Sequence, residues 1–424
     1  MGVVVLVPRV ANAVLNELAA HLRIVMVGGP RQAGKTTLLR EYLTARGGSY
    51  RSLDSADTLR ASVDDPVAFA EYGLAPRIVD EVQLGGDELV RAIKMEVDRS
   101  RKPGQFILSG SSRFLTIPTL SESLAGRIAF IELWPLSLVE RTGSASDFLS
   151  KVFADPNSLL TESTWTRREY IDCVVAGGYP EALSITSELA RRAWYDGYLQ
   201  TVISRDIQNF ATVTHSAVMA KLLTLVAARA GSLHVISDLA QSVELARDTT
   251  RNYLTYLDTV YLTHQVPAWS ANLTSRLVKS PKTYLTDSGL AAHLLAVTST
   301  ELLEPGHTAL GPLLETFVAA ELLKAIAYNT ERVQMHHLRT ADKAEVDFVL
   351  EGPKGRLVAV EVKASASPGA NALNGLRWLR GKLGDRLHAG ILLHLGTEAA
   401  SRGDGIYSLP LSTLWNHRPL RPVG

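Results

Sequence analysis

The chain has 424 residues, of which 46% are hydrophobic and 21% are charged, and this composition excludes a disordered chain, a collagen and a disulfide scaffold. The 44 Lys and Arg residues balance 43 Asp and Glu residues, so the net charge of +1 argues against a polycation that coats DNA by charge alone but permits a local basic patch. The single cysteine, Cys173, cannot form an intramolecular disulfide, which fits a reducing cytosol.

No stretch of the sequence approaches the roughly 20 apolar residues that span a bilayer. The apolar run Val3–Val7 is too short for the core of a signal peptide, and Pro8 and Arg9 follow it. We therefore expect a cytoplasmic protein without a membrane partner.

Short apolar runs alternate with amphipathic segments in the first third of the chain, which predicts a parallel sheet covered by helices on both faces. The predicted strands are Ile24–Val27, Tyr50–Leu53, Ile78–Val79, Phe106–Leu108 and Ile128–Leu133.

The segment Gly29-Pro-Arg-Gln-Ala-Gly-Lys-Thr36 matches the phosphate-binding loop pattern and lies between the first strand and a predicted helix, Thr37–Tyr42. Its glycines let backbone N–H groups curl around phosphate oxygens, and the helix N-terminus adds a favourable dipole. We expect Lys35 to reach the β- and γ-phosphates of ATP and Thr36 to bind Mg²⁺, the alternative being a chance glycine turn. The expected nucleotide-binding residues are Gly29, Pro30, Arg31, Gln32, Ala33, Gly34, Lys35, Thr36 and Thr37.

Two adjacent acids, Asp80 and Glu81, end the strand Ile78–Val79. Acids at a strand end are common on protein surfaces, but after a phosphate-binding loop they are typical of ATPases. We expect Asp80 to hold Mg²⁺ through water and Glu81 to orient or deprotonate the attacking water.

A hydroxyl at the end of the next strand can lie between these acids and the γ-phosphate and sense hydrolysis. Ser109 is the first candidate and Ser111 the second, with a plain Ser/Gly turn as the alternative.

Together with Ser123-Leu-Ala-Gly-Arg127, these motifs resemble a widespread family of prokaryotic AAA-type ATPases in which a C-terminal region of unknown function follows the ATPase module. Further matches are Gly177-Gly-Tyr-Pro180, Arg205-Asp-Ile207, Asp287-Ser-Gly-Leu290 and Leu314-Glu-Thr-Phe-Val318. The resemblance covers nearly the whole chain and implies an AAA-like core that assembles into a homo-oligomer, such as a hexameric ring.

ATPases of this type use a positive charge on the γ-phosphate, often from a neighbouring subunit. Arg127 is the best candidate, with Arg113 and Arg205 as alternatives. Each of them is equally compatible with a surface arginine that pairs with an acid.

The middle of the chain is predicted to be helical after a loose connection rich in Ser, Thr, Asp and Asn at 143–166. Three helices at 217–230, 235–243 and 248–260, with extended segments near 262–266 and 283–285, suggest a winged helix. The start of its third helix carries four candidates for contacting DNA: Arg247, Thr250, Arg251 and Asn252. The next residue, Tyr253, is expected to pack inside the domain. The alternative is a winged helix used only for protein contacts.

The C-terminal part combines Glu345-Val-Asp347, Val358-Ala-Val-Glu361-Val-Lys363 and Glu315 within an apolar helix. This arrangement resembles PD-(D/E)xK nucleases, in which two carboxylates hold Mg²⁺ and the lysine activates water. The resemblance implies a metal site made of Glu315, Asp347 and Glu361 with Lys363 beside it. The alternative is a set of Glu–Lys and Asp–Lys pairs on an open sheet face.

We therefore predict an α/β chain with an AAA-like ATPase core (1–140), a linker and helical region (141–215), a winged-helix-like domain (216–310) and a nuclease-like domain (311–424). The predicted function is an ATPase with ATP and Mg²⁺ as cofactors that couples hydrolysis to binding or processing of nucleic acid, with DNA as partner. The alternative is an ATP-driven protein-remodelling or signalling switch whose nuclease-like domain is inactive and binds a partner.

Overall fold

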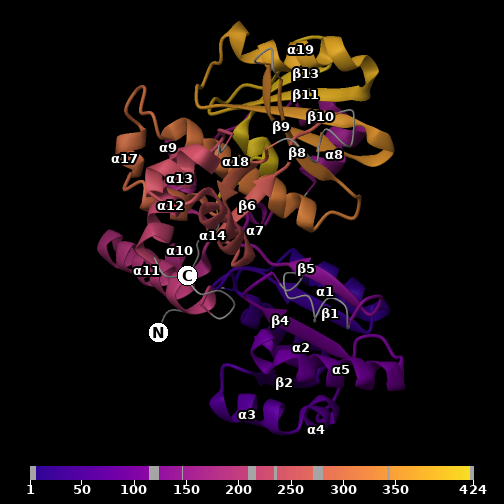
Figure 1. Ribbon diagram of the computed structural model, residues 1–424. Coiled ribbons are helices and arrows are strands. Elements are labelled where there is room, and N and C mark those ends of the chain that lie inside the picture. The colour runs from indigo at the N-terminus through magenta and orange to yellow at the C-terminus, as the bar shows by residue number, and fades with distance from the viewer. Residues whose placement is uncertain are drawn as a thin grey trace. The chain divides into compact units, whose positions relative to one another are not determined.

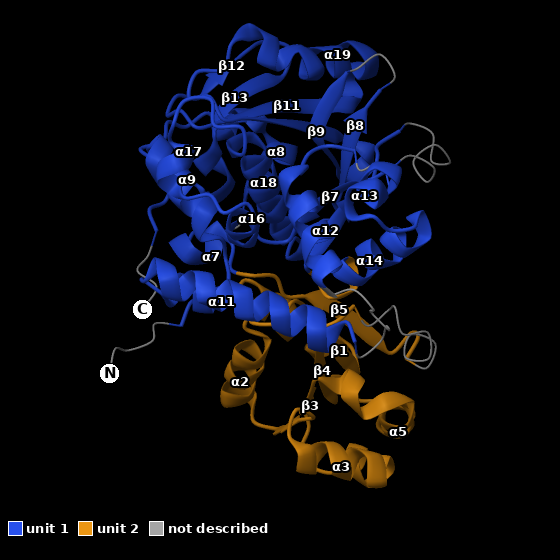
Figure 2. Ribbon diagram, turned by 60° about the vertical axis from the view of Figure 1, so that its left-hand side comes forward, with its two compact units in different colours: residues 1–7, 136–257, 262–424 blue, residues 8–135, 258–261 orange. Residues whose placement is uncertain are grey.

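The computed structural model describes residues 6–113, 124–145, 147–208, 216–233, 236–270, 280–340 and 344–420. The chain divides into two compact units (Figure 2). The N-terminal unit consists of residues 8–135 and 258–261, and the C-terminal unit of residues 1–7, 136–257 and 262–424. Each unit is built on a large sheet of its own.

The N-terminal unit is built on a parallel five-stranded sheet of order β2-β3-β4-β1-β5 (Figure 1). The strands are β1 (Ile24–Gly28), β2 (Ser49–Ser52), β3 (Arg77–Asp80), β4 (Phe106–Gly110) and β5 (Ile128–Glu132). All five predicted strands are present, and the predicted α/β class with an N-terminal parallel sheet is confirmed. Because β4 lies between β1 and β3, the carboxyl ends of these three strands meet at one edge of the sheet.

Helix α1 (Ala11–His21) precedes the first strand. The other helices of this unit connect β1 to β4: α2 (Lys35–Arg46), α3 (Ala56–Asp64), α4 (Pro66–Glu71), the short 3₁₀ turn η1 (Val82–Gly85) and α5 (Gly86–Ser100). The core packs Met26 and Leu108 of the sheet against Leu89, Ile93 and Val97 of α5. Burying each such side chain contributes about 1.5–3 kcal/mol, so the sheet whose edge carries the phosphate-binding loop rests on a well-packed core.

The first part of the C-terminal unit differs from the prediction. Instead of a loose connection, α7 (Leu138–Thr142) is followed by α8 (Phe148–Ala154) and the 3₁₀ turn η3 (Pro156–Leu159). Four side chains of α8 are buried, which stabilises this helix despite its polar flanks: Phe148, Leu149, Val152 and Phe153. The chain continues through α9 (Arg167–Ala176), α10 (Pro180–Ser184), α11 (Glu188–Thr201) and the π-helical turn η4 (Val202–Asp206).

Three helices and a strand pair follow: α12 (Ser216–Ala228), α13 (Ile236–Val243), α14 (Arg247–Thr259) and the antiparallel pair β6 (Thr263–Val266) and β7 (Lys282–Leu285). This element order is the one expected for a winged helix, which stays a prediction. Thr250 was expected to contact DNA, but it is fully buried and donates to the carbonyl of Ala246. Tyr253 packs inside, as expected.

The rest of the unit begins with α16 (Ser288–Leu294), α17 (Ser299–Leu302) and the apolar helix α18 (Leu310–Ala327). A six-stranded sheet of order β12-β13-β11-β10-β9-β8 follows, in which β10 is antiparallel to β9 and parallel to β11. Its strands are β8 (Gln334–Arg339), β9 (Glu345–Glu351), β10 (Leu357–Lys363), β11 (Leu387–His394), β12 (Ala400–Ser401) and β13 (Ile406–Pro410). Helix α19 (Asn374–Leu383) packs on this sheet through Leu376 and Leu379, and η8 (Leu411–Trp415) ends the unit.

Two of the sequence motifs meet inside the C-terminal unit. The buried carboxylate of Asp287 accepts hydrogen bonds from the backbone N–H of Gly178 (2.6 Å) and of Leu290 (2.9 Å), so it ties the Gly-Gly turn to the N-terminus of α16. A Cβ on Gly177, whose φ is +67°, would lie 2.3 Å from the same carboxylate, which explains the glycine. Within the described part of the chain, no helix is long and apolar enough to cross a membrane.

Candidate functional site

The phosphate-binding loop joins β1 to α2 in a conformation that requires glycine. Gly29 and Gly34 have φ values of +155° and +94°, and Gln32 also has a positive φ of +61°. A Cβ on Gly29 would lie 2.1 Å from the carbonyl oxygen of Leu133, so no other residue fits there. The loop runs directly into the N-terminus of α2, where backbone N–H groups can bind an anion.

Lys35 lies at the mouth of this loop. Its side chain is buried, and the ammonium donates to the carbonyl oxygens of Gly29 (2.8 Å) and Pro30 (3.0 Å). The ammonium is therefore already positioned over the loop in which phosphate oxygens would bind.

Asp80, at the end of β3, receives hydrogen bonds on both carboxylate oxygens. Thr36 (2.9 Å) and Tyr50 (2.6 Å) donate to Oδ2, and Ser109 donates to Oδ1. The predicted partners Thr36, Asp80 and Ser109 are thus brought together at the carboxyl edge of the sheet. Burial, and then the hydrogen bond to Asp80, raises the pKa of Tyr50 to about 12, so its hydroxyl remains a donor at neutral pH.

Glu81 is the residue after Asp80, and its backbone adopts the left-handed conformation with a φ of +54°. The buried carboxylate accepts hydrogen bonds from Ser111 (2.9 Å) and from the amide of Gln83. The first-choice serine, Ser109, therefore contacts Asp80, and the second choice, Ser111, contacts Glu81. Whether either senses hydrolysis stays a prediction.

Arg9 is a part of this site that sequence reasoning missed. Its guanidinium donates to the carbonyl oxygen of Ala33 in the loop and to that of Trp134 after β5, both at 2.6 Å. Arg9 therefore fastens the back of the phosphate-binding loop to the end of β5. Tyr50 was missed as well, because nothing in the local sequence signals a contact with Asp80.

The three candidate arginines lie in different places. Arg127 precedes β5, which pairs with β1 in parallel so that Glu132 lies opposite Gly28 at the start of the loop. Arg127 therefore lies at the opposite edge of the sheet, about 16 Å along the strand from Glu132. There its guanidinium binds both oxygens of Asp98, at 2.6 and 2.9 Å. Arg127 cannot reach a phosphate in its own chain, so only its role in a neighbouring subunit stays a prediction.

Arg113 lies at the carboxyl edge of the same sheet. Its guanidinium forms an ion pair with Glu132 (2.9 Å) and lies over the ring of Tyr261, 4.8 Å from the centroid. Arg205 belongs to the C-terminal unit, where its side chain is exposed on η4.

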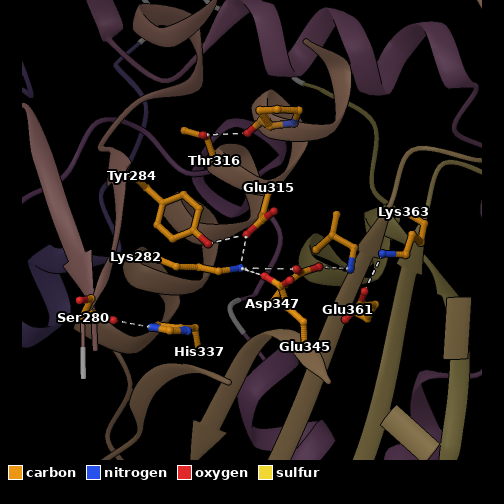
Figure 3. Close-up of polar contacts among 12 residues, drawn as sticks. Ser280, Lys282, Tyr284, Glu315, Thr316, His337, Glu345, Asp347, Glu361 and Lys363 are labelled. Atoms are coloured by element: carbon orange, nitrogen blue, oxygen red, sulfur yellow. Dashed lines mark hydrogen bonds and ion pairs between the residues drawn. The ribbon is translucent and has the colours of Figure 1, made fainter. Parts of the chain in front are cut away.

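A second polar cluster lies in the C-terminal unit, where Lys282 of β7 is surrounded by carboxylates (Figure 3). Its ammonium lies 3.1 Å from Glu315 Oε1, 3.0 Å from Glu345 Oε1 and 3.8 Å from Asp347 Oδ1. Tyr284 of the same strand donates its hydroxyl to Glu315. Sequence reasoning missed both β7 residues because they are distant in sequence from the acids.

The four predicted residues of this cluster do come together. In the antiparallel pair, Val360 lies opposite Phe348, so Glu361 and Asp347 follow on the same face of the sheet. Asp347 Oδ2 accepts from the backbone N–H of Val362 (2.9 Å), and Lys363 donates to Glu361 Oε1. Glu361 Oε2 is buried and has no hydrogen-bond partner among the described residues.

The carboxylates of the cluster shift each other's protonation. Burial, and then the charges of Glu315 and Glu361, raises the pKa of Asp347 well above its usual range. Burial would lower the pKa of Lys282, but the carboxylates of Glu315, Asp347 and Glu345 outweigh it and raise that pKa. Lys282 therefore remains an ammonium ion.

The donor set does not fit a divalent metal ion in this arrangement. Among the residues that the structure describes, no group of three or more His, Cys, Asp and Glu side chains is placed to hold one. Instead, the ammonium of Lys282 lies between Glu315, Glu345 and Asp347.

Three family models match successive parts of the chain: an AAA domain over residues 21–142, a domain of unknown function (DUF8612) over 167–301 and a domain of unknown function (DUF4143) over 310–414. Two relatives are each 32% identical to this chain over 362 residues: the uncharacterized protein Rv2008c of Mycobacterium tuberculosis and the uncharacterized protein Mb2031c of Mycobacterium bovis. These alignments cover 85% of this chain and 74% of each relative.

Among solved structures, the Walker-type ATPase PABY2304 of Pyrococcus abyssi is 13% identical with a TM-score of 0.38, covering 67% of this chain and 94% of that one. The RuvB Holliday junction branch migration motor of Thermotoga maritima is 18% identical with a TM-score of 0.30, covering 62% and 90%. Both TM-scores are below 0.5, so neither likeness supports a conclusion about this chain.

The phosphate-binding loop and the Asp80–Thr36 contact agree with the AAA domain match at the same residues. The two relatives show the family: the chain belongs to the family of these mycobacterial proteins, and in this chain an AAA domain precedes two domains of unknown function.

Proposed function

We propose that the N-terminal unit hydrolyses ATP in a Mg²⁺-dependent reaction and that the C-terminal unit couples this hydrolysis to binding of nucleic acid. The observation that carries the proposal is the contact of Thr36 with Asp80 (2.9 Å) beside a lysine already held over the phosphate-binding loop. Thr36 and Asp80 would hold Mg²⁺, and the ion would neutralise phosphate charge.

The other residues of the site have distinct tasks in this proposal. The N–H groups of the loop and of the first turn of α2 bind the phosphates, and Lys35 moves from the two loop carbonyls to the β- and γ-phosphates. Glu81 orients the attacking water with a carboxylate that Ser111 and Gln83 hold in place. Such positioning of a water by a general base is worth about 10²–10⁴ in rate.

The positive charge on the γ-phosphate comes from a second copy of the chain, with Arg127 as the donor. Its distance from the loop of its own chain supports a role in trans, because the sheet separates the two. The active species in this proposal is therefore a homo-oligomer.

Nucleic acid would meet the outer face of α14. Arg247, Arg251 and Asn252 are exposed on this helix, whereas Thr250 is not available. Arg251 forms an ion pair with Asp248 (2.6 Å), which a phosphate would have to displace. Because both side chains are exposed, this displacement costs little.

A second candidate function is an ATP-driven protein-remodelling or signalling switch. The position of Lys282 among the carboxylates favours it, because a nuclease-like domain without a metal site would serve to bind a partner. The two functions differ in whether DNA accelerates ATP hydrolysis.

The test is steady-state phosphate release from ATP by the full chain, with and without Mg²⁺ and with and without duplex and single-stranded DNA. Lys35→Ala should abolish turnover, and the exposed control Lys102→Ala should not. Stimulation by DNA that disappears in Arg247→Ala/Arg251→Ala supports coupling to nucleic acid. Turnover that DNA leaves unchanged favours the remodelling function, and no Mg²⁺-dependent turnover contradicts both.

A further inference from the structure

The carboxylate cluster of the C-terminal unit already contains a cation. Lys282 has no exposed surface, and its ammonium lies 3.0 to 3.8 Å from Glu315, Glu345 and Asp347. Taking an ammonium out of water is costly unless carboxylates replace the lost hydration. Three carboxylates from two elements, α18 and β9, provide this replacement, so the contact is a built site for a positive charge.

The strand β7 supplies two donors to the same cluster. Side chains two apart on a strand lie on one face, so Tyr284 points the same way as Lys282 and donates to Glu315 (Figure 3). Lys282 and Tyr284 both bind Oε1 of Glu315, and Oε2 packs against Gly231, where a Cβ would lie 2.2 Å from it. Gly231 has a φ of +80° and follows α12, and nearby Leu233 forms a bridge with Lys282.

The spacing of the oxygens suits an ammonium rather than a divalent ion. Lysine offers three donors, and N–H···O contacts of about 3 Å match its distances to Glu315 and Glu345, whereas Asp347, at 3.8 Å, contributes through its charge. Mg²⁺ requires oxygens at about 2.0–2.1 Å in an octahedral arrangement. The carboxylate oxygens could approach a Mg²⁺ ion to that distance only if the ammonium of Lys282 had first left its position between them.

The remaining acid does not provide an independent metal site. Glu361 has one oxygen bound by Lys363 and one buried oxygen without a hydrogen-bond partner among the described residues. Its neighbour Asp347 is shared between the backbone N–H of Val362 and Lys282.

We propose that Lys282 is the resident cation of the Glu315–Glu345–Asp347 cluster and closes it to divalent metals for as long as β7 stays in place. The contact is autoinhibitory: a nuclease-like cluster would take up a metal only after Lys282 leaves. This inference concerns the C-terminal unit alone and does not depend on ATP hydrolysis by the N-terminal unit.

The test is Mn²⁺ binding to the nucleotide-free full chain, followed by the electron paramagnetic resonance signal of free Mn²⁺. Lys282→Met should gain one bound Mn²⁺ per chain over the parent, and Lys282→Met/Asp347→Asn should lose it again. Lys221→Met, which removes an exposed lysine of α12, is the matched control and should gain none. Two results would overturn the proposal. One is a parent chain that already binds Mn²⁺ at a site that Asp347→Asn abolishes, and the other is a folded Lys282→Met variant that gains no bound Mn²⁺.

A measurement on the parent chain covers the case in which Lys282→Met does not fold. An amine-reactive reagent with mass spectrometry should modify Lys221 and leave Lys282 unmodified, with or without Mn²⁺. Modification of Lys282 that rises with Mn²⁺ would mean that the metal displaces the ammonium, and the proposal would be wrong.

Discussion

Arg9 offers a sharp test of how the phosphate-binding loop is held. Its guanidinium bridges the carbonyl oxygens of Ala33 and Trp134, each at 2.6 Å. Arg9→Ala removes both hydrogen bonds and leaves unchanged the loop N–H groups that would bind the nucleotide. We expect the loop to lose its fixed shape and the affinity for ATP to fall.

The magnitude follows from the hydrogen bond to Ala33, because Ala33 belongs to the loop whereas Trp134 does not. A hydrogen bond to a charged group contributes about 1.5–3 kcal/mol. Arg9 is only partly buried, so the lower value applies. Because 1.4 kcal/mol corresponds to a tenfold change in affinity, Kd for ATP should rise about tenfold.

The assay is equilibrium binding of a fluorescent ATP analogue, with thermal unfolding measured alongside. Arg9→Lys should recover part of the affinity, because one ammonium can reach one of the two carbonyls. Arg91→Ala removes an exposed arginine paired with Glu88 and should change nothing. If Arg9→Ala lowers the unfolding temperature but leaves Kd for ATP unchanged, Arg9 only stabilises the unit and this reasoning is refuted.

Three further outcomes are expected. Tyr50→Phe removes one donor to the Asp80 carboxylate, a hydrogen bond to a charged group worth about 1.5 kcal/mol, and should raise the Mg²⁺ concentration for half-maximal turnover roughly tenfold while Kd for Mg²⁺-free ATP stays the same. An unchanged Mg²⁺ dependence would exclude this role. Arg127→Ala should lower turnover by about 10³-fold or more, and mixing it with Glu81→Gln should restore activity, whereas a purely structural Arg127–Asp98 pair would give no such complementation. Burial, and then the charge of Arg402, lowers the pKa of His394 from 6.5 to about 4, so the unfolded chain binds a proton there that the folded chain does not. The free energy of unfolding should therefore fall by about 3 kcal/mol as the pH drops through this range, and His394→Asn should flatten that slope in urea titrations.

The sequence was informative where the signal is local. The five strands of the N-terminal unit, the phosphate-binding loop and the acids at the end of β3 all follow from periodicity or from a short motif. The pairing that puts Glu361 beside Asp347 could also be predicted, because a short connection between two strands implies that they pair antiparallel.

Contacts between segments that are distant in the sequence could not be predicted from it. Arg9 lies 24 and 125 residues from its two partners, Tyr50 lies 30 residues from Asp80, and Lys282 lies 33 residues from Glu315. A lysine in a short strand carries no local sign that three carboxylates surround it. The segment 143–166 was misjudged for a related reason, since its many polar residues concealed the apolar face of α8.

The most direct test of the central claim, ATP hydrolysis by the N-terminal unit, is a comparison of ATP binding and turnover in Glu81→Gln. The substitution preserves Lys35, Thr36 and Asp80 and removes only the carboxylate that orients the water. The account predicts that this variant binds ATP as tightly as the parent while phosphate release falls at least about 100-fold, and that the exposed control Glu88→Gln matches the parent in both. Turnover equal to that of the parent in Glu81→Gln would contradict the account.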